Sequence, residues 1–199
     1  MNLSTAALSD ALDAFRIHGQ ALGLAPLWDG MYFFGPAYTI RYRPADVEPG
    51  PVGNYIDDVP AGSVICIDNG GRTDCAVWGD ILTTVASKRL VAGTVIDGVC
   101  RDVAKAIAVE YPLVTRGRFM RTGSDRVQVD AVQVAITLGT VVVKPGDLVI
   151  GNDDGVVVIP ADRCDEVLKL ARSIDEREAA IVASVETGMR LDDARAAAI

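Results

Sequence analysis

The sequence predicts a single α/β domain, built from parallel β-α-β units, Val-rich antiparallel hairpins and a C-terminal helix. Two observations lead to this fold class. Between residues 62 and 117, short apolar segments alternate with helical ones, which is typical of parallel strands joined by helices. Half of the residues are hydrophobic but only 6% are aromatic, so the core must pack through aliphatic side chains. A length of 199 residues suits one domain, expected to span residues 1–199.

The N-terminal elements follow from local patterns. Residues 4–17 begin with a capping serine and carry apolar side chains at helical spacing, which predicts a helix. Residues 33–43, FFGPAYTIRYR, predict a strand with a kink at Gly-Pro. Residues 62–70, GSVICIDNG, predict a short apolar strand that ends in a glycine-rich loop, and residues 78–90 predict the helix after it. The same pattern repeats as strand, helix and strand over residues 93–98, 101–110 and 113–117. Asp97, just before Gly98, is expected to shape a turn.

The character of the chain changes after about residue 125. Residues 127–160 form a series of short Val-rich segments, with turn-forming residues at 144–147 and 152–155. This pattern favours antiparallel hairpins. Residues 161–187 predict a long helix, and its Arg/Glu-rich end is typical of a face exposed to solvent or to a second subunit.

Charge and cysteine usage exclude several classes of protein. The formal net charge is −8, and an acidic surface repels phosphate backbones, so no direct nucleic-acid partner is expected. The cysteines have no CxxC spacing and indicate a reduced, cytoplasmic protein; they are Cys66, Cys75, Cys100 and Cys164. No signal peptide or apolar run of membrane-spanning length is present, so no membrane association is expected.

The sequence also lacks most kinds of catalytic machinery. His18 is the only histidine, which excludes a multi-histidine metal site and argues against a Ser-His-Asp unit. No phosphate-binding glycine motif is convincing. The four lysines occupy polar helix positions or a turn, so none suits Schiff-base chemistry. Arginine, carboxylates, backbone amides and a hard cation remain as the means of catalysis.

Polar residues do occur at two successive strand–helix junctions. Ligands of parallel α/β sheets bind beyond the carboxyl ends of the strands, so both junctions are expected to face one cleft. At the first, Gly79 and Asp80 open a helix whose first amides, at Ile81 and Leu82, suit a carboxylate. Asp80 can alternatively cap its own helix. An Asp80 turned inward would repel a bound anion unless a cation lay between them.

The second junction carries the adjacent pair Arg101-Asp102. The planar guanidinium of Arg101 suits a carboxylate or a 2-oxo acid. Asp102 offers one hard oxygen ligand, and Mg²⁺ is commonly held by one or two carboxylates and water. The alternative is structural: Asp102 caps the helix and Arg101 forms a surface ion pair.

These junctions resemble a known family. The acidic residue Asp80, twenty intervening residues and then Arg101-Asp102 are similar to the signature of class II pyruvate aldolases acting on 4-hydroxy-4-methyl-2-oxoglutarate and 4-carboxy-4-hydroxy-2-oxoadipate. That family also contains the regulator of ribonuclease activity A. Further stretches match in the same order over nearly the whole chain: LSDAL, FFGPAYTI, WGDIL, GTVIDGVCRD and KPGDLVIGNDDGVVVIP.

The resemblance implies a fold similar to a swivelling phosphohistidine domain and a set of site residues. Arg101 would bind the carboxylate and keto oxygen of pyruvate, and the amides of Ile81 and Leu82, beside Gly79, would hold the carboxylate. Asp102 would ligate Mg²⁺ or Mn²⁺, and Asp80 completes the catalytic set. The family forms homotrimers or dimers of trimers with sites between subunits. A neighbour's acidic residue can support the site, with Glu176 and Glu178 as candidates.

Two functions are therefore compatible with the sequence. The first is a metal-dependent lyase that cleaves 4-hydroxy-2-oxo acids to pyruvate and decarboxylates oxaloacetate, since both reactions form the same enolate. The second is a regulator that inhibits a ribonuclease by binding it, without catalysis. The intact Asp80, Arg101 and Asp102 favour the enzyme. The group beyond the pyruvate unit of the substrate is left open.

Overall fold

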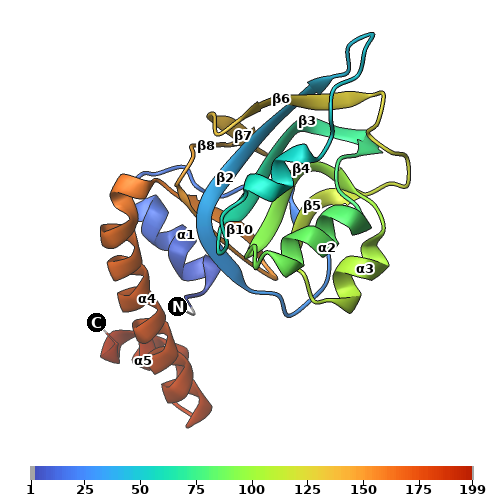
Figure 1. Ribbon diagram of the computed structural model, residues 1–199. Coiled ribbons are helices and arrows are strands. Elements are labelled where there is room, and N and C mark those ends of the chain that lie inside the picture. Colours follow the sequence, from blue (N-terminus) through green and yellow to red (C-terminus); the bar gives the residue numbers. More distant parts are fainter. Residues whose placement is uncertain (1–2, 199) are drawn as a thin grey trace.

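The computed structural model describes residues 3–198 and is built around one strongly twisted sheet (Figure 1). Over these residues the main sheet has eight strands in the order β1-β5-β4-β3-β2-β9-β10, with β6 also paired to β2. Strands β2 to β5 are parallel, whereas β1, β6, β9 and β10 pair antiparallel to their neighbours. The mixed α/β class is therefore confirmed.

The bounds of the strands are as follows: β1 Ala25–Pro26, β2 Phe33–Pro44, β3 Val64–Ala76, β4 Gly93–Cys100, β5 Leu113–Arg118, β6 Val127–Val132, β7 Ile136–Leu138, β8 Val141–Val143, β9 Leu148–Asn152 and β10 Gly155–Ile159. The α-helices are α1 Thr5–Ala14, α2 Asp80–Lys88, α3 Val103–Ala108, α4 Cys164–Glu186 and α5 Leu191–Ala197. Two 3₁₀ helices are η1 Asn54–Asp58 and η2 Ala161–Arg163.

Both faces of the parallel strands are buried. Side chains alternate along a strand, so Ile65 and Ile67 of β3 face one way and Val64 and Cys66 the other. The first pair packs in one cluster with residues of α2, α3 and η1. The second pair packs against the β7–β8 hairpin. Burial on both faces explains why these strands are continuous apolar runs without a polar alternation.

The N- and C-terminal helices lie together at the β9–β10 end of the sheet. Ser4 caps α1, with its hydroxyl accepting from the Ala7 amide at 3.0 Å. Helix α1 then packs on α4 and β10. Helix α4 continues beyond the sheet and α5 folds back on it, a helix that the sequence did not predict (Figure 1). The expected helix over residues 161–187 is confirmed as η2 followed by α4.

Strand β3 departs from the prediction of a short strand ending in a glycine-rich loop. It has 13 residues and pairs with β4 on both sides of the glycines. While β3 advances from Asp68 to Arg72, β4 advances only from Asp97 to Gly98. Gly70 and Gly71 take positive φ angles of 62° and 69°, which glycine adopts without steric cost. The glycines are thus an irregularity inside a longer strand.

The expectation that Asp97 shapes a turn is wrong. Asp97 lies inside β4 and is buried, with its carboxylate paired to the Arg116 guanidinium. The other carboxylate oxygen accepts from the Gly139 amide at 3.0 Å. This one side chain therefore ties β4 to β5 and to the turn between β7 and β8.

Residues 127–160 form the expected antiparallel hairpins, β7–β8 and β9–β10. Residues 152–155 make the turn of the second hairpin, whereas residues 144–147 connect the two hairpins. Within the described residues, no helix combines the length and hydropathy needed to cross a membrane.

The buried pair of Asp97 and Arg116 gives a prediction about stability. Asp97→Ala should lower the free energy of unfolding by about 3–5 kcal/mol, because Arg116 loses its partner in a largely buried position. Urea unfolding followed by circular dichroism measures this difference. The matched control is Asp192→Ala, which removes an exposed partner of Arg190 and should cost under about 1 kcal/mol. Equal losses in the two variants would contradict the structural role of Asp97.

Candidate active site

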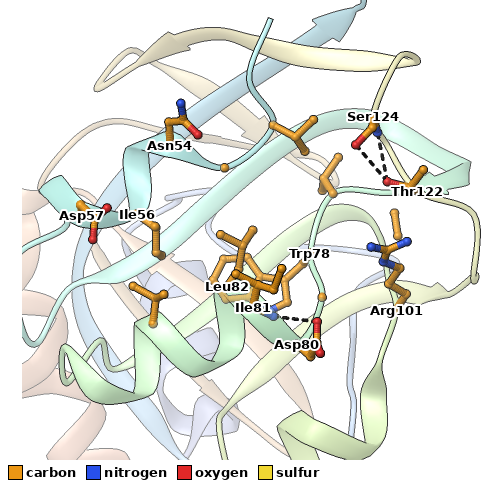
Figure 2. Close-up of a pocket in the computed structure, with 16 residues that line it drawn as sticks. Asn54, Ile56, Asp57, Trp78, Asp80, Ile81, Leu82, Arg101, Thr122 and Ser124 are labelled. Carbon is orange, nitrogen blue, oxygen red and sulfur yellow. Dashed lines mark hydrogen bonds between the residues drawn. The ribbon is translucent and has the colours of Figure 1, made fainter.

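A pocket of about 610 Å³ opens beyond the carboxyl ends of β3 and β4 (Figure 2). Its floor is the segment from Ala76 to Leu82, which links β3 to α2. Arg101 lines it from the end of β4, while η1 and the loop containing Thr122 form its sides. The two strand–helix junctions singled out in the sequence do meet here.

Backbone pairing holds the two junctions against each other. The amide of Val77 donates to the carbonyl of Val99 at 3.3 Å, and the amide of Arg101 donates to the carbonyl of Trp78 at 2.9 Å. The chains therefore stay paired past the end of the regular ladder. The side chains of Arg101 and Asp102 emerge beside Gly79 for this reason.

Gly79 leaves room for this close approach. A Cβ placed on it would lie 2.7 Å from Asp102 Oδ2 and 3.4 Å from Arg101 Nε. The backbone of Gly79 is extended, so steric room and not an unusual φ angle selects glycine here. Any larger residue would push the Arg101 and Asp102 side chains out of place.

Asp80 is the first residue of α2, and Gly79 occupies the N-cap position without a side-chain cap. The Asp80 carboxylate accepts from the amide of Ile81 at 2.8 Å (Figure 2). Asp80 thus occupies one of the two amides that the sequence assigned to a substrate carboxylate. The Ile81 amide becomes available to a ligand only when the Asp80 side chain turns away, while Leu82 also lines the pocket.

Asp102 does not cap the helix that follows it, contrary to the structural alternative. It stands at the N-cap position of α3 but makes no capping hydrogen bond through its side chain. Its φ and ψ angles of 55° and 37° are left-handed, an uncommon conformation for a residue with a side chain. The carboxylate instead turns toward the first junction, where Oδ2 lies 3.4 Å from the amide nitrogen of Asp80.

Arg101 and Asp102 also contact each other. Arg101 Nε lies 3.4 Å from Asp102 Oδ2, and the two side chains are 40% and 43% exposed. An ion pair of this length and exposure is weak, so both groups remain accessible to a ligand. Arg101 belongs to the pocket lining, whereas Asp102 lies directly beside it.

The first junction is braced from below by Trp78. Its indole N–H donates to the hydroxyl of Thr83 at 2.9 Å, and that hydroxyl donates to the carbonyl of Gly79 at 2.9 Å. The indole also stacks on Tyr111, with ring centroids 6.0 Å apart. Trp78 and Thr83 are buried, so this chain fixes the Gly79 turn from inside the core.

The donor set suits a hard, mostly hydrated cation. Asp102 presents one accessible carboxylate, which together with water is a common arrangement for Mg²⁺. Across residues 3–198, no three His, Cys, Asp or Glu side chains converge on a possible metal position. Such a sparse carboxylate site does not resemble the tetrahedral nitrogen and sulfur sites of zinc.

Three of the four cysteines are buried thiols, and Cys164 is partly exposed. Cys66, Cys75 and Cys100 are fully buried. Burial raises the pKa of the Cys100 thiol to about 11, although this residue ends the strand that carries Arg101. Since the thiolate is the reactive form, Cys100 is inert at neutral pH.

Sequence reasoning found the floor of the pocket but missed its sides. Glu176 and Glu178 lie on α4, away from the pocket in the same chain. The missed lining includes Asn54, Ile56, Thr122 and Ser124. These residues belong to a 3₁₀ turn and a loop, which have no apolar periodicity to reveal them.

The sequence comparisons all identify the same family. Residues 5–158 match the profile of the RraA-like family, described as Aldolase/RraA. Protein DlpA of Legionella pneumophila is 41% identical over 198 residues, which are 98% of this chain but only 32% of DlpA, so the chain spans about a third of that relative. A Halalkalibacterium halodurans protein provisionally named 4-hydroxy-4-methyl-2-oxoglutarate aldolase is 33% identical over 170 residues, 85% of this chain and 79% of that protein.

Solved structures agree with this family. An uncharacterized protein from Pseudomonas syringae is 43% identical with a TM-score of 0.92, covering 98% of this chain and 93% of its own. Streptomyces coelicolor RraAS2, described as an unusual member of the RNase ES inhibitor RraA family, is 27% identical with a TM-score of 0.81. The matched region covers 88% of this chain and 90% of RraAS2.

The brace under Gly79 gives a second prediction. Thr83→Val should lower the free energy of unfolding by about 1–3 kcal/mol, because the buried indole N–H of Trp78 loses its acceptor. Thr84→Val is the matched control, since Thr84 makes the same kind of bond to the Asp80 carbonyl at an exposed position. It should cost under about 1 kcal/mol. Urea unfolding measures both, and a larger loss for Thr84→Val would contradict the brace.

Proposed function

Because the chain belongs to the RraA-like family, we propose that it is a divalent-metal-dependent lyase. It would cleave 4-hydroxy-2-oxo acids to pyruvate by a retro-aldol reaction and decarboxylate oxaloacetate at the same site. The observation that carries this proposal is the orientation of Asp102, whose carboxylate leaves its own helix uncapped and turns to the Gly79 junction beside Arg101. The aldolase name of a relative at 33% identity supports the same class of reaction.

Arg101 would bind the 2-oxo acid end of the substrate. Its guanidinium lines the pocket and is 40% exposed, so it can donate to the carboxylate and the keto oxygen together. The first turn of α2 provides the second anchor through the amides of Ile81 and Leu82. A substrate carboxylate would displace the Asp80 side chain from the Ile81 amide, which frees the Asp80 carboxylate for a second role.

That second role is proton transfer. Cleavage of the bond between C3 and C4 requires a base to take the proton from the C4 hydroxyl. The described residues of the pocket lining include two carboxylates, Asp57 and Asp80, and Asp80 is the one beside the Arg101 junction. Asp80 would therefore accept this proton directly or through a water molecule.

Asp102 would hold Mg²⁺ or Mn²⁺, with water as the remaining ligands. Such a cation supplies Lewis-acid stabilisation for the negative charge that develops on the pyruvate oxygen. Arg101 stabilises the same charge from the protein side. The adjacency of Arg101 and Asp102 in the chain keeps both contributions at one end of the substrate.

The arrangement of Gly79, Arg101 and Asp102 also helps to choose between the lyase and a regulator that inhibits a ribonuclease by binding it. Binding to a ribonuclease requires only a surface, and gives no reason for a glycine to make room for the Arg101 and Asp102 side chains. A pulldown and an inhibition assay with a ribonuclease, using the Asp102→Ala variant, separates the two functions. Ribonuclease inhibition that survives this substitution, together with absence of pyruvate formation, would favour the regulator.

The direct test of the proposal is release of pyruvate. With Mg²⁺ present, the protein should release pyruvate from oxaloacetate and from several 4-hydroxy-2-oxo acids, and chelation should abolish the activity. Arg101→Ala and Arg101→Lys should each lower kcat/KM by about 100-fold or more, since lysine lacks the planar fork. A lactate dehydrogenase-coupled assay measures pyruvate. Arg190→Ala, at an exposed ion pair in the C-terminal helices, is the control and should retain full activity.

The requirement for glycine at position 79 gives a further prediction. Gly79→Ala should lower kcat/KM by up to about 100-fold, because the new methyl group displaces Asp102 and Arg101. Gly50→Ala is the matched control, since its Cβ would meet Gln128 only at an ordinary contact distance of 3.4 Å. The coupled assay and the melting temperature are measured together. Full activity in Gly79→Ala would show that the position of Asp102 has no catalytic importance.

A further inference from the structure

The two sides of the pocket lie outside the strands of the sheet (Figure 2). At the polar end, next to Arg101, the side is a turn whose Thr122 and Ser124 side chains line the pocket. At the η1 end, the side begins with Val52 and Gly53, just before η1. Segments without ladder hydrogen bonds are more mobile than strands, so other contacts must hold both sides in position.

Backbone hydrogen bonds near the start of β6 reach both sides of the pocket. The amide of Arg126 donates to the carbonyl of Gly123 at 2.9 Å, which closes the turn at the polar end. The amide of Val129 donates to the carbonyl of Pro51 at 3.1 Å, next to the residues that lead into η1. Because β6 is itself paired with β2, the main sheet supports both sides through this one strand.

The side chain of Arg126 holds the turn at the polar end. Its Nη1 donates to the carbonyl of Thr122 at 3.4 Å and to the carbonyl of Ser124 at 3.1 Å. The carbonyl of Arg126 in turn accepts from Arg72 Nη1 at 3.2 Å, which connects the turn to β3. Arg126 itself lies outside the described lining of the pocket, so its effect on a ligand is exerted through the turn.

The turn is also fixed against the floor of the pocket and within itself. A Cβ on Gly123 would lie 2.8 Å from the carbonyl oxygen of Ala76, so the two segments are in close contact. The Ser124 amide donates to the Thr122 hydroxyl, and that hydroxyl donates to the Ser124 hydroxyl, each at 3.2 Å. Two pocket-lining hydroxyls are therefore held in a defined orientation beside Arg101, where they can bind a polar group of a ligand.

The side chain of Gln128 holds the chain at the η1 end. It is only 6% exposed, and its Oε1 accepts from the amides of Asp46 and Gly50, each at 3.0 Å. Its Nε2 donates to Asp46 Oδ2 at 3.1 Å. A buried amide bonded in this way has little freedom, so it fixes the chain that leads to Val52 and Gly53.

We propose that Arg126 and Gln128 are positioning residues for substrate binding, an inference that rests on the proposed function. Arg126 places the hydroxyls of the turn beside the 2-oxo acid end of the substrate, and Gln128 sets the opposite side, which faces the rest of the substrate. All of these bonds lie within one chain. Arg101 is held by a separate backbone bond to Trp78, so losing either positioning residue should weaken binding without slowing the chemical step.

Arg126→Ala should raise KM for oxaloacetate by about 10-fold and leave kcat within about threefold, because the turn beside the 2-oxo acid end loses its support. Arg121→Ala is the matched control. Arg121 precedes the same turn, but its guanidinium lies over the Phe119 ring, 5.6 Å from the ring centroid. Its removal should leave KM within about twofold. The lactate dehydrogenase-coupled assay with Mg²⁺ measures both variants.

A conservative substitution tests whether hydrogen bonds to the turn cause this effect. An ammonium group also donates hydrogen bonds, but it lacks the fixed planar geometry of a guanidinium. Arg126→Lys should therefore raise KM by only about threefold. A lysine variant as impaired as Arg126→Ala, an unchanged KM in Arg126→Ala, or an equal rise in Arg121→Ala would overturn the role of Arg126.

Gln128→Met keeps the length of the side chain but removes the bonds to the Asp46 and Gly50 amides. It should raise KM for 4-hydroxy-4-methyl-2-oxoglutarate by about 10-fold with kcat nearly unchanged. Gln133→Met is the matched control, since Gln133 Oε1 accepts from the Thr39 amide at 3.1 Å, outside the described lining of the pocket. Both variants should have a lower melting temperature, but only Gln128→Met should raise KM. An unchanged KM, or failure of Gln128→Met to fold, would assign Gln128 a purely structural role.

A binding measurement separates this inference from the lyase proposal. Calorimetric titration with pyruvate in the presence of Mg²⁺ needs no catalysis, and Arg126→Ala should raise the Kd for pyruvate by about 10-fold. Arg121→Ala should leave this Kd within about twofold. That result supports the inference even if no substrate is cleaved and the lyase proposal fails. Normal pyruvate release with an unchanged KM in Arg126→Ala overturns the inference alone, and absence of both binding and cleavage in the wild-type protein overturns both.

Discussion

The amide of Arg101 donates to the carbonyl of Trp78, and this contact fixes how the two strand–helix junctions meet. Parallel strands bring their carboxyl ends to one edge of a sheet, but that alone leaves the junctions free to diverge. Continued pairing past the ladder holds Gly79 against the Arg101 and Asp102 side chains. The placement of the Arg101 and Asp102 side chains at one end of the pocket therefore depends on backbone geometry.

The sequence predicted those parts of the structure that depend on local patterns. The β-α-β cadence followed from apolar periodicity, and the shared cleft of the Asp80 and Arg101 junctions followed from the rule that ligands bind beyond the carboxyl ends of parallel strands. Long-range partners carry no such pattern. The Asp97-Gly98 pair is typical of a turn, whereas the partners that hold Asp97 inside a strand, Arg116 and Gly139, are distant in the chain. Likewise, the glycines at 70 and 71 are compatible with a loop or with an irregularity inside a strand, and pairing with β4 on both sides decides for the strand.

Asp102 combines a left-handed backbone with a side chain that leaves the following helix uncapped. A non-glycine residue in this region costs on the order of 1 kcal/mol, and at a helix N-cap the side chain normally offsets such costs by capping. Asp102 neither caps the helix nor forms a strong ion pair. Its contacts with the Asp80 amide and with Arg101 are both 3.4 Å long. A residue selected for stability alone would be expected to cap α3. The carboxylate is left free for an external ligand, as the proposed function requires.

The anion site that the proposed function requires must overcome the overall charge of the protein. The chain carries a formal net charge of −8, so its surface opposes anionic ligands in general. Arg101 and the first amides of α2 reverse this locally, at the polar end of the pocket. Their influence is short in range at physiological salt, with a screening length of about 8 Å. Asp57, at the η1 end of the pocket, has Arg89 as a neighbour at 3.9 Å, so the strongest attraction for an anion within the described lining lies at Arg101 and the start of α2.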